Sequence, residues 1–270
     1  MTATIARSGE LLDRREDISS AVPNADAETI ISIEDITVVF DGFKAVDGLN
    51  LNVRCNELRV VIGPNGAGKT TLLDIICGKT KPRAGRVMFK GTDLTRLEEH
   101  QIVRVGVARK FQTPSVYEDL SVRENFEISL PEGRGILGSL LFRRSPRVSA
   151  RIAEVASWVF LDSALQTRAK HLSHGQKQWL EIGMMLIQDP DLLLLDEPVA
   201  GMSHSEREKT AELLCRIARG KSIIVIEHDM EFVRSIAQTL TVMHQGRVLC
   251  EGSIDEVQHN QRVIEVYLGA

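Results

Sequence analysis

Residues 63–70 read Gly-Pro-Asn-Gly-Ala-Gly-Lys-Thr, which fits the phosphate-binding pattern G-x-x-x-x-G-K-[ST]. Its glycines allow backbone N–H groups to converge on phosphate oxygens. Lys69 would reach the β- and γ-phosphates of a nucleotide, and the Thr70 hydroxyl would sit on Mg²⁺. The residues predicted to bind the nucleotide here are Gly63, Pro64, Asn65, Gly66, Ala67, Gly68, Lys69, Thr70 and Thr71.

The sequence on either side of this loop has the shape that a phosphate site needs. The apolar run 58–62 predicts a buried strand, and residues 70–77 predict a helix that ends at Gly78. The start of a helix attracts anions because its N–H groups are unpaired and its dipole is positive there. The alternative, a glycine-rich loop with a chance Gly-Lys-Thr, does not account for both flanking elements.

Polar side chains follow two later apolar strands. Asp196 and Glu197 come directly after the strand 192–195, and His228 follows the strand 222–226. Parallel strands bind ligands at their carboxyl edge. There Asp196 would hold Mg²⁺ through water, Glu197 would polarise an attacking water, and His228 would help to position it. The simpler readings are carboxylates that cap a turn and a histidine on the surface; the phosphate loop makes both less favoured.

A second candidate anion site lies at residues 172–176, Leu-Ser-His-Gly-Gln. Ser173 and Gln176 fit the capping box S-x-x-Q, so the segment also predicts an ordinary helix start. A helix start with a serine and a glycine can equally bind phosphate. Two anion sites and one acidic pair suggest one nucleotide bound by two chains. Gln112 could sense Mg²⁺ and the water, or it could be an ordinary loop amide.

Composition excludes several classes of protein. The chain has 270 residues, 43% of them hydrophobic, which is enough for a sizeable core. A net charge of −4 and a pI near 6.0 argue against nucleic-acid binding through broad electrostatics. The four cysteines lie far apart and predict reduced thiols in a cytosolic protein. Apolar runs are too short to cross a bilayer, and the N-terminus has no signal-peptide core.

The pattern of elements predicts an α/β fold. Strands are expected in three early segments, namely 30–40, 45–53 and 86–89. A helical subdomain is expected at about 115–172, with loop material over 131–146. Thereafter the strands 192–195 and 222–226 alternate with three helices, expected at 179–187, 206–219 and 230–237. Such alternation predicts a parallel sheet covered on both faces.

The two ends of the chain differ from this core. Residues 1–28 show little periodicity and are expected to form a mobile extension. The folded domain is therefore predicted to span residues 29–270. Its end, 241–270, predicts two short strands around Gly246 and one final helix.

From residue 30 onward the order of motifs resembles that of an ATP-binding-cassette (ABC) ATPase. The resemblance implies a P-loop fold with a mostly parallel core sheet, an antiparallel β subdomain and an inserted helical subdomain. It makes 63–71 the Walker A loop and 192–196 the Walker B strand. It makes Gln112 the Q-loop residue, Glu197 the catalytic carboxylate and His228 the switch histidine. Phe40 occupies the place of the aromatic residue that stacks on adenine, and Phe43 is a second candidate.

The resemblance also implies a second cassette. In this family two cassettes face head to tail, so the signature LSGGQ of one chain contacts ATP held by the other. The corresponding residues here are Ser173, His174, Gly175 and Gln176, with His174 replacing the first glycine. The D-loop departs from the usual pattern, because Ser203 stands where many relatives have Asp or Asn. This departure puts coupling across the interface by that residue in doubt.

A finer resemblance is to the branched-chain amino acid importer group. The segments 226–230 and 263–269 carry it, and within the group 172–183 and 197–202 are similar to urea-transporter ATP-binding subunits. This implies an ATPase that uses ATP and Mg²⁺ to power import of urea or a related small amide. It implies a cytoplasmic subunit held at the inner face of the membrane by permease subunits, with an identical or different second cassette. No contact with nucleic acid or with the transported substrate is implied.

Several alternatives stay open at this point. The cassette could serve a branched-chain amino acid importer or a lipid or lipopolysaccharide exporter. A soluble ABC ATPase would carry a long coiled coil or a second cassette, and a P-loop kinase would leave 172–176 unexplained. The insert 113–170 is expected to pass movement to the membrane subunit. Four arginines could touch that partner or lipid headgroups, or form a solvated loop: Arg143, Arg144, Arg147 and Arg151.

Overall fold

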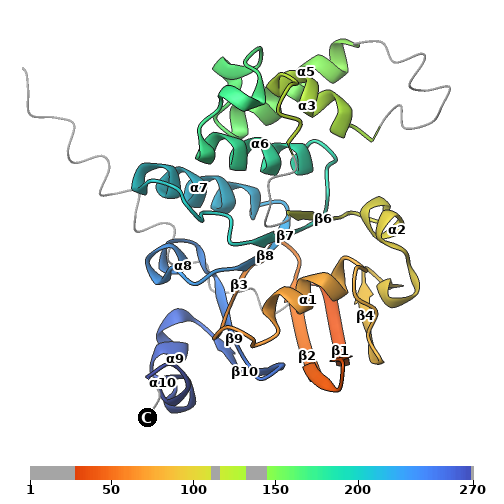
Figure 1. Cartoon of the computed structure of the whole chain (residues 1–270), viewed down its shortest axis with the longest axis vertical. Helices are drawn as coiled ribbons and strands as arrows, with labels where there is room; N and C mark the ends of the chain where they lie inside the picture. Colours follow the sequence, from red (N-terminus) through yellow and green to blue (C-terminus); the bar gives the residue numbers. More distant parts are fainter. Residues whose placement is uncertain (1–27, 111–115, 132–144, 269–270) are drawn as a thin grey trace, which may run out of the picture.

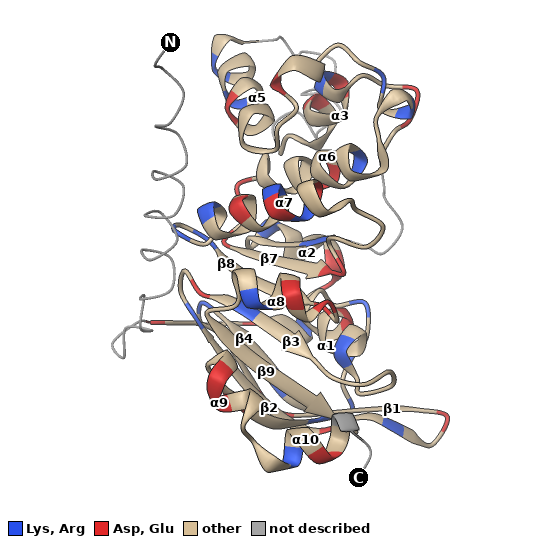
Figure 2. Cartoon of the chain, turned by 90° about the vertical axis from the view of Figure 1, so that its left-hand side faces the viewer, with Lys and Arg blue, Asp and Glu red and all other residues tan. Residues whose placement is uncertain are grey.

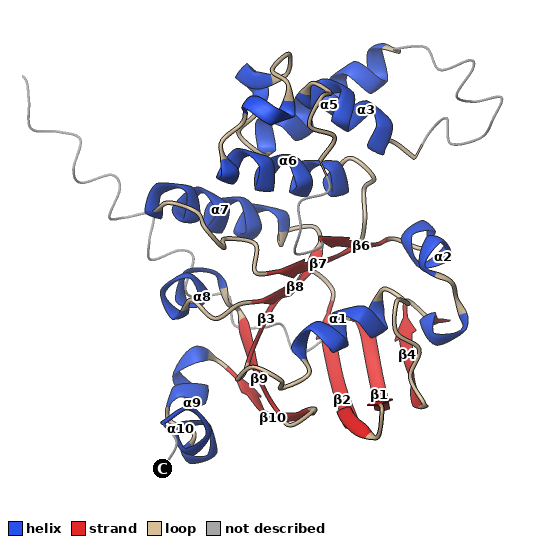
Figure 3. Ribbon diagram, in the orientation of Figure 1, coloured by secondary structure: helices blue, strands red, loops and turns tan. Residues whose placement is uncertain are grey.

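The computed structural model describes residues 28–110, 116–131 and 145–268. Two sheets organise this part of the chain (Figure 3). The larger has the strand order β10–β9–β3–β8–β7–β6, and the smaller has the order β2–β1–β4–β5. The predicted extension over residues 1–27, Gln112, Arg143 and Arg144 lie outside the described residues.

The larger sheet is parallel except at one edge. Its strands are β3 (Leu58–Ile62), β6 (Val107–Lys110), β7 (Leu192–Asp196), β8 (Ser222–Ile226), β9 (Thr239–His244) and β10 (Arg247–Gly252). Four neighbouring pairs are parallel, and only β9 and β10 pair antiparallel. The predicted strands 58–62, 192–195 and 222–226 are therefore confirmed.

These central strands read as continuous apolar runs because both of their faces are buried. In β7, Leu193 and Leu195 pack into one hydrophobic core, while Leu192 and Leu194 pack into a second core on the other face. All five residues of β7 and all five of β8 are buried. The sheet thus separates two cores and holds the polar residues at the strand ends in fixed positions.

One face of the sheet is covered by α1 (Lys69–Ile76) and the smaller antiparallel sheet. That sheet consists of β1 (Thr29–Phe40), β2 (Phe43–Arg54), β4 (Ala84–Phe89) and β5 (Thr92–Asp93). The apolar residues of α1 share a core with residues of β1 and β2. Two short helices, η1 (Leu94–Arg96) and α2 (Glu99–Arg104), connect this layer to β6. The sequence pattern does not predict α2.

The other face is covered by helices (Figure 1). They are α3 (Val122–Ser129), α5 (Pro146–Trp158), α6 (His174–Leu186), α7 (His204–Ile217) and α8 (Met230–Ile236), with the short helices η2 (Asp162–Ala164) and η3 (Ala169–His171) between α5 and α6. Several begin with a serine cap, which satisfies a helix N–H that would otherwise lack a partner. Ser121 accepts from the Glu124 N–H, and Ser145 from the Val148 N–H.

Three expectations about the elements need correction. Pro146, expected to end a loop, instead lies in the first turn of α5, where its missing N–H costs nothing. Helix α6 begins at His174 rather than at residue 179, because the Ser173 capping box starts it one and a half turns earlier. The chain ends in two helices, α9 (Ile254–Gln258) and α10 (Gln261–Leu268), rather than in one.

Charged residues of both signs are scattered over the described elements in the view of Figure 2, and α7 carries both. Within the described residues, every helix is too short or too polar to span a bilayer.

Candidate functional site

The predicted phosphate loop lies between β3 and α1, and tight packing shapes it. Gly68 has φ +96°, a left-handed conformation that side chains disfavour. A Cβ on Gly68 would lie 2.5 Å from the Ala45 carbonyl oxygen, and one on Gly63 would lie 2.2 Å from the Met243 carbonyl oxygen. Backbone of β2 therefore lies against the loop at Gly68, and backbone of β9 lies against it at Gly63. Glycine at these two positions lets the loop fit between them.

Lys69 is the first residue of α1 and reaches back over the loop. Its Nζ donates to the carbonyl oxygens of Gly63, at 2.7 Å, and Pro64, at 3.0 Å. Partial burial lowers the pKa of Lys69 because it disfavours the charged ammonium, and the nearby carboxylates of Glu197 and Asp196 offset part of this fall. The ammonium thus bonds to the loop and interacts electrostatically with both carboxylates.

Asp196 ends β7 and is almost fully buried, with 2% of the residue exposed. Its Oδ2 has no hydrogen-bond partner among the residues that the structure describes. Burial raises the pKa of Asp196, and Arg109 and the Thr70 hydroxyl oppose the rise. A buried carboxylate oxygen without a partner fits a site that receives a water or a cation ligand. Asp196 and the exposed Thr70 are therefore the described residues that could hold Mg²⁺.

Glu197 follows Asp196 in an unusual backbone conformation. Its φ is +46°, in the left-handed region, where a residue with a side chain is strained by about 1–3 kcal/mol. Its N–H donates to the Ile226 carbonyl oxygen at 3.0 Å, which ties the end of β7 to the end of β8. Such strain is typical of functional sites. The turn directs Glu197 toward His228, whose Nδ1 lies 3.4 Å from Glu197 Oε1.

Glu227 is a further residue of this edge and is not among the predicted site residues. It is 2% exposed, and its carboxylate accepts from the backbone N–H groups of His228, at 3.1 Å, Asp229, at 3.4 Å, and Val199, at 3.5 Å. Burial raises its pKa, and these N–H groups act against the rise. Glu227 therefore fixes the segment after β8 against the segment after Pro198. An acidic residue directly after an apolar strand was the available signal.

The 173–176 segment caps α6 as its pattern predicted. The Gln176 N–H donates to Ser173 Oγ at 3.2 Å, and the Ser173 N–H donates to Gln176 Oε1 at 2.9 Å. Side chains of α6 pack in the core on one face of the sheet, whereas those of α1 pack in the core on the other face. Figure 1 shows α6 and α1 on opposite sides of the central strands. One chain therefore does not bring Ser173 to its own phosphate loop.

The aromatic residues near the loop are exposed. Phe40 and Phe43 pair across the turn between β1 and β2, and the residues are 48% and 65% exposed. Because Gly68 touches Ala45 of the same hairpin, this turn lies on the phosphate-loop side of the sheet. Of the other predicted site residues, Gln112 falls outside the described part of the chain.

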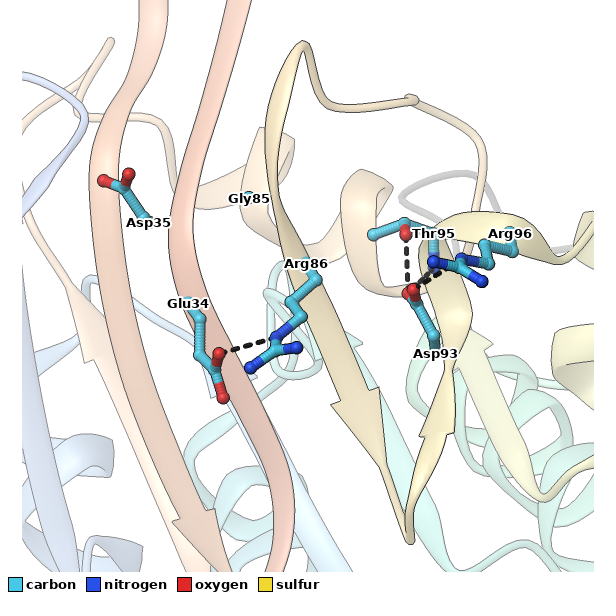
Figure 4. A pocket seen from close by; sticks show the side chains of 7 residues that line it. All are labelled: Glu34, Asp35, Gly85, Arg86, Asp93, Thr95 and Arg96. Atoms are coloured by element: carbon cyan, nitrogen blue, oxygen red, sulfur yellow. Dashed lines mark hydrogen bonds and ion pairs between the residues drawn. The ribbon is translucent and has the colours of Figure 1, made fainter.

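A hollow of about 440 Å³ lies outside this site. It is lined by residues of β1, β4, β5 and η1, shown in Figure 4, and includes none of the predicted site residues. Four of its charged residues form two ion pairs: Arg86 pairs with Glu34 at 2.7 Å, and Arg96 pairs with Asp93 at 3.0 Å. We attach no ligand to this hollow.

Comparisons with known proteins agree with this geometry. A family model described as "ABC transporter" matches residues 46–200, and one described as "Branched-chain amino acid ATP-binding cassette transporter" matches residues 247–270. The chain is similar to the high-affinity branched-chain amino acid transport ATP-binding proteins LivG of Escherichia coli and BraF of Pseudomonas aeruginosa. Identity to LivG is 32%, covering 90% of this chain and 99% of that protein. Identity to BraF is 33%, covering 89% and 98%.

Solved structures show the same fold. A crystal structure of an ATP-binding cassette of an ABC transporter in its ADP conformation superposes with a TM-score of 0.78. It is 31% identical and covers 90% of this chain and 99% of that one. A nucleotide-free cassette superposes with a TM-score of 0.77 at 30% identity, covering 90% and 100%. The chain therefore belongs to the ABC transporter family and is one of its ATP-hydrolysing cassettes.

Proposed function

We propose that this chain is the ATP-hydrolysing subunit of a membrane importer of the branched-chain amino acid type, and that the importer carries urea or a related small amide. The observation that carries the hydrolytic role is the group of polar residues at the ends of β7 and β8. Buried Asp196, strained Glu197 and exposed His228 lie together there, next to the ammonium of Lys69.

Each residue has a task that its position supports. The phosphate loop and Lys69 bind the phosphates of ATP, and Thr70 and Asp196 hold the Mg²⁺ that goes with it. When bound, Mg²⁺ neutralises charge on the phosphate oxygens. Glu197 orients the attacking water and accepts its proton, and His228 holds the Glu197 carboxylate in place. Gln112 and Phe40 keep their predicted roles beside the water and the adenine.

A second cassette completes the site in this proposal. Ser173, His174, Gly175 and Gln176 start α6 on the face of the sheet opposite to α1. They are thus available to the nucleotide of another chain and remote from the phosphate loop of their own chain. The second cassette is either a copy of this chain or a related one. Permease subunits hold the pair at the inner face of the membrane, and the helices between residues 115 and 172 contact them.

Two observations bear differently on the transported substrate. The segments 172–183 and 197–202 are similar to those of urea-transporter subunits, which supports a small amide. The relatives named above are branched-chain amino acid transport proteins, and the model matching residues 247–270 carries the same description. Branched-chain amino acid import is therefore the second candidate function.

Reconstitution separates the two substrates. The chain is purified with the membrane protein that accompanies it and placed in vesicles supplied with ATP on the cassette side. We expect ATP-dependent uptake of labelled urea and no uptake of labelled leucine. Uptake of leucine alone would replace the urea assignment with the second candidate. A matched preparation carrying Glu197→Gln should show uptake of neither, and transport by that preparation would contradict the hydrolytic role.

A further inference from the structure

Two side chains join the start of α6 to the turn 199–203, which follows Glu197 in the same chain. His174 Nε2 donates to the carbonyl oxygen of Ala200 at 3.1 Å. Glu206, in the first turn of α7, accepts from Ser173 Oγ at 3.2 Å through its Oε1. Its Oε2 accepts from the Ser203 N–H at 2.9 Å and from the Ser203 hydroxyl at 2.8 Å. The two elements are thus connected at two separate points.

Helix capping explains two of the three hydrogen bonds that the Glu206 carboxylate accepts. Its bonds to Ser203 form the capping box of α7, a local device found at many helix starts. Its bond to Ser173 crosses to a different helix, 33 residues away in sequence, and plays no part in capping α7. Hydrogen bonds from Ser203 and Ser173 hold the pKa of Glu206 below its usual range, so the carboxylate stays ionised and accepts at both oxygens.

The contact between Glu206 and Ser173 explains why residue 175 is glycine. Gly175 is helical, and its conformation is one that any residue can adopt. A Cβ at this position would nevertheless lie 2.3 Å from Glu206 Oε1. Real Cβ atoms do not approach oxygen so closely, and Oε1 is held by Ser173. Gly175 therefore makes room for the Glu206 carboxylate within its own chain.

We propose that Glu206 and His174 are positioning residues that hold the Ser173 end of α6 against the turn 199–203. The segment offered to the nucleotide of a second cassette and the segment that follows the catalytic Glu197 then move as one unit. This inference rests on the proposed function, since it requires that Ser173 face the nucleotide of another chain. It assigns a role to His174, which stands where the family signature has glycine, and to an acidic residue outside the recognised motifs.

The test compares two equilibria of the full chain. Binding of ATP to single chains is measured at a protein concentration too low for pairing. ATP-dependent pairing is measured by light scattering in the Glu197→Gln background, in which hydrolysis is slow. Glu206→Ala and His174→Ala should each weaken pairing about tenfold and change single-chain ATP affinity by less than about twofold. Because both residues hold the same two segments together, the loss of pairing free energy in the double variant should be smaller than the sum of the losses in the two single variants.

Controls separate positioning from folding. Glu208→Ala removes an exposed acid of α7, which contacts His204 at 3.6 Å, and should leave pairing unchanged. Glu206→Gln keeps an oxygen acceptor, so its pairing should be weakened less than that of Glu206→Ala. If Glu206→Ala fails to fold, Glu206→Gln and His174→Ala together test the inference. Normal pairing in the Glu206 variant and in His174→Ala would overturn the inference. If the Glu197→Gln chain itself did not pair with ATP, the two-chain site would fail first and this inference with it.

Discussion

His228 Nδ1 lies 3.4 Å from Glu197 Oε1, although 31 positions separate the two residues in the chain. The contact arises because β7 and β8 are parallel neighbours in register, with Asp196 opposite Ile226. Both side chains leave the sheet at its carboxyl edge, where the next turn begins. Both remain accessible, with 69% of the His228 side chain and 41% of the Glu197 side chain exposed. A carboxylate and an imidazole in this arrangement can share the task of holding a water.

Replacing Glu197 by glutamine should slow ATP turnover by about 10²–10⁴-fold, because the amide cannot accept a proton from water. ATP binding should persist, since Lys69 and the loop are untouched. The measurements are the steady-state ATPase rate and the affinity for ATP. Glu212→Gln, an exposed position on α7, is the matched control. Turnover near the wild-type rate in Glu197→Gln would remove Glu197 from the mechanism.

His228→Ala should reduce kcat about tenfold or more and leave the affinity for ATP nearly unchanged. The reason is that the His228 imidazole lies 3.4 Å from the Glu197 carboxylate and 4.0 Å from that of Glu227, while no hydrogen bond or ion pair within the described part of the chain joins it to Lys69. His204→Ala provides a control, because His204 is exposed at the start of α7 and its ring lies 3.6 Å from the exposed Glu208. A change in ATP affinity as large as the change in kcat would show that His228 supports binding instead.

Asp196→Asn should stabilise the nucleotide-free chain at neutral pH. Burial raises the pKa of Asp196, so the folded chain binds this proton more tightly than the unfolded chain. The stability contributed by protonation is present below the unfolded pKa, about 4, and is lost as pH rises through the raised folded pKa. The variant removes this loss, so its Tm should fall less than that of the wild type between about pH 5 and about pH 8.

Two further measurements complete the test of Asp196. The buried carboxyl of Glu227 also has a raised pKa, so Asp196→Asn should reduce the fall in Tm and not abolish it. Asp162→Asn, at an exposed position, should follow the wild type. Added Mg²⁺ and ATP should raise the Tm of the wild type more than that of Asp196→Asn. A Tm for the variant below that of the wild type near pH 8 would contradict the prediction.

Gly183→Ala should destabilise the fold by about 1–3 kcal/mol, since a Cβ there would overpack a filled core. That Cβ would lie 2.6 Å from Cε1 of the fully buried Phe126. Gly220→Ala is a matched control, because a Cβ on Gly220 would meet no atom within 4 Å. Thermal unfolding should show a Tm lower by several degrees for the first variant and little change for the second. Equal Tm values would mean that α3 and α6 can move apart at no cost.

Local signals explain how much of the fold was predictable. The strands 58–62, 192–195 and 222–226 stand out because burial on both faces leaves no polar positions in them. The sequence does not reveal α2 because this helix has six residues and only one of them, Ile102, is buried. Its apolar residues are too few to show a helical period. The start of α6 was placed late because the first turn carries polar residues. Its capping box, already recognised, was the better marker of the boundary.

The sequence by itself determined the residue types and the local features: a loop with the phosphate-binding pattern, two acids and a histidine after apolar strands, and a capped helix. These depend on neighbours in the chain, and spacing reveals them. Only the tertiary structure decided which side chains meet, because such meetings depend on the packing of distant elements. The approach of His228 to Glu197, the burial of Glu227 against Val199, and the bond from Ser173 to Glu206 are all of this kind. Likewise, only the two cores show that α1 and α6 lie on opposite faces of the sheet.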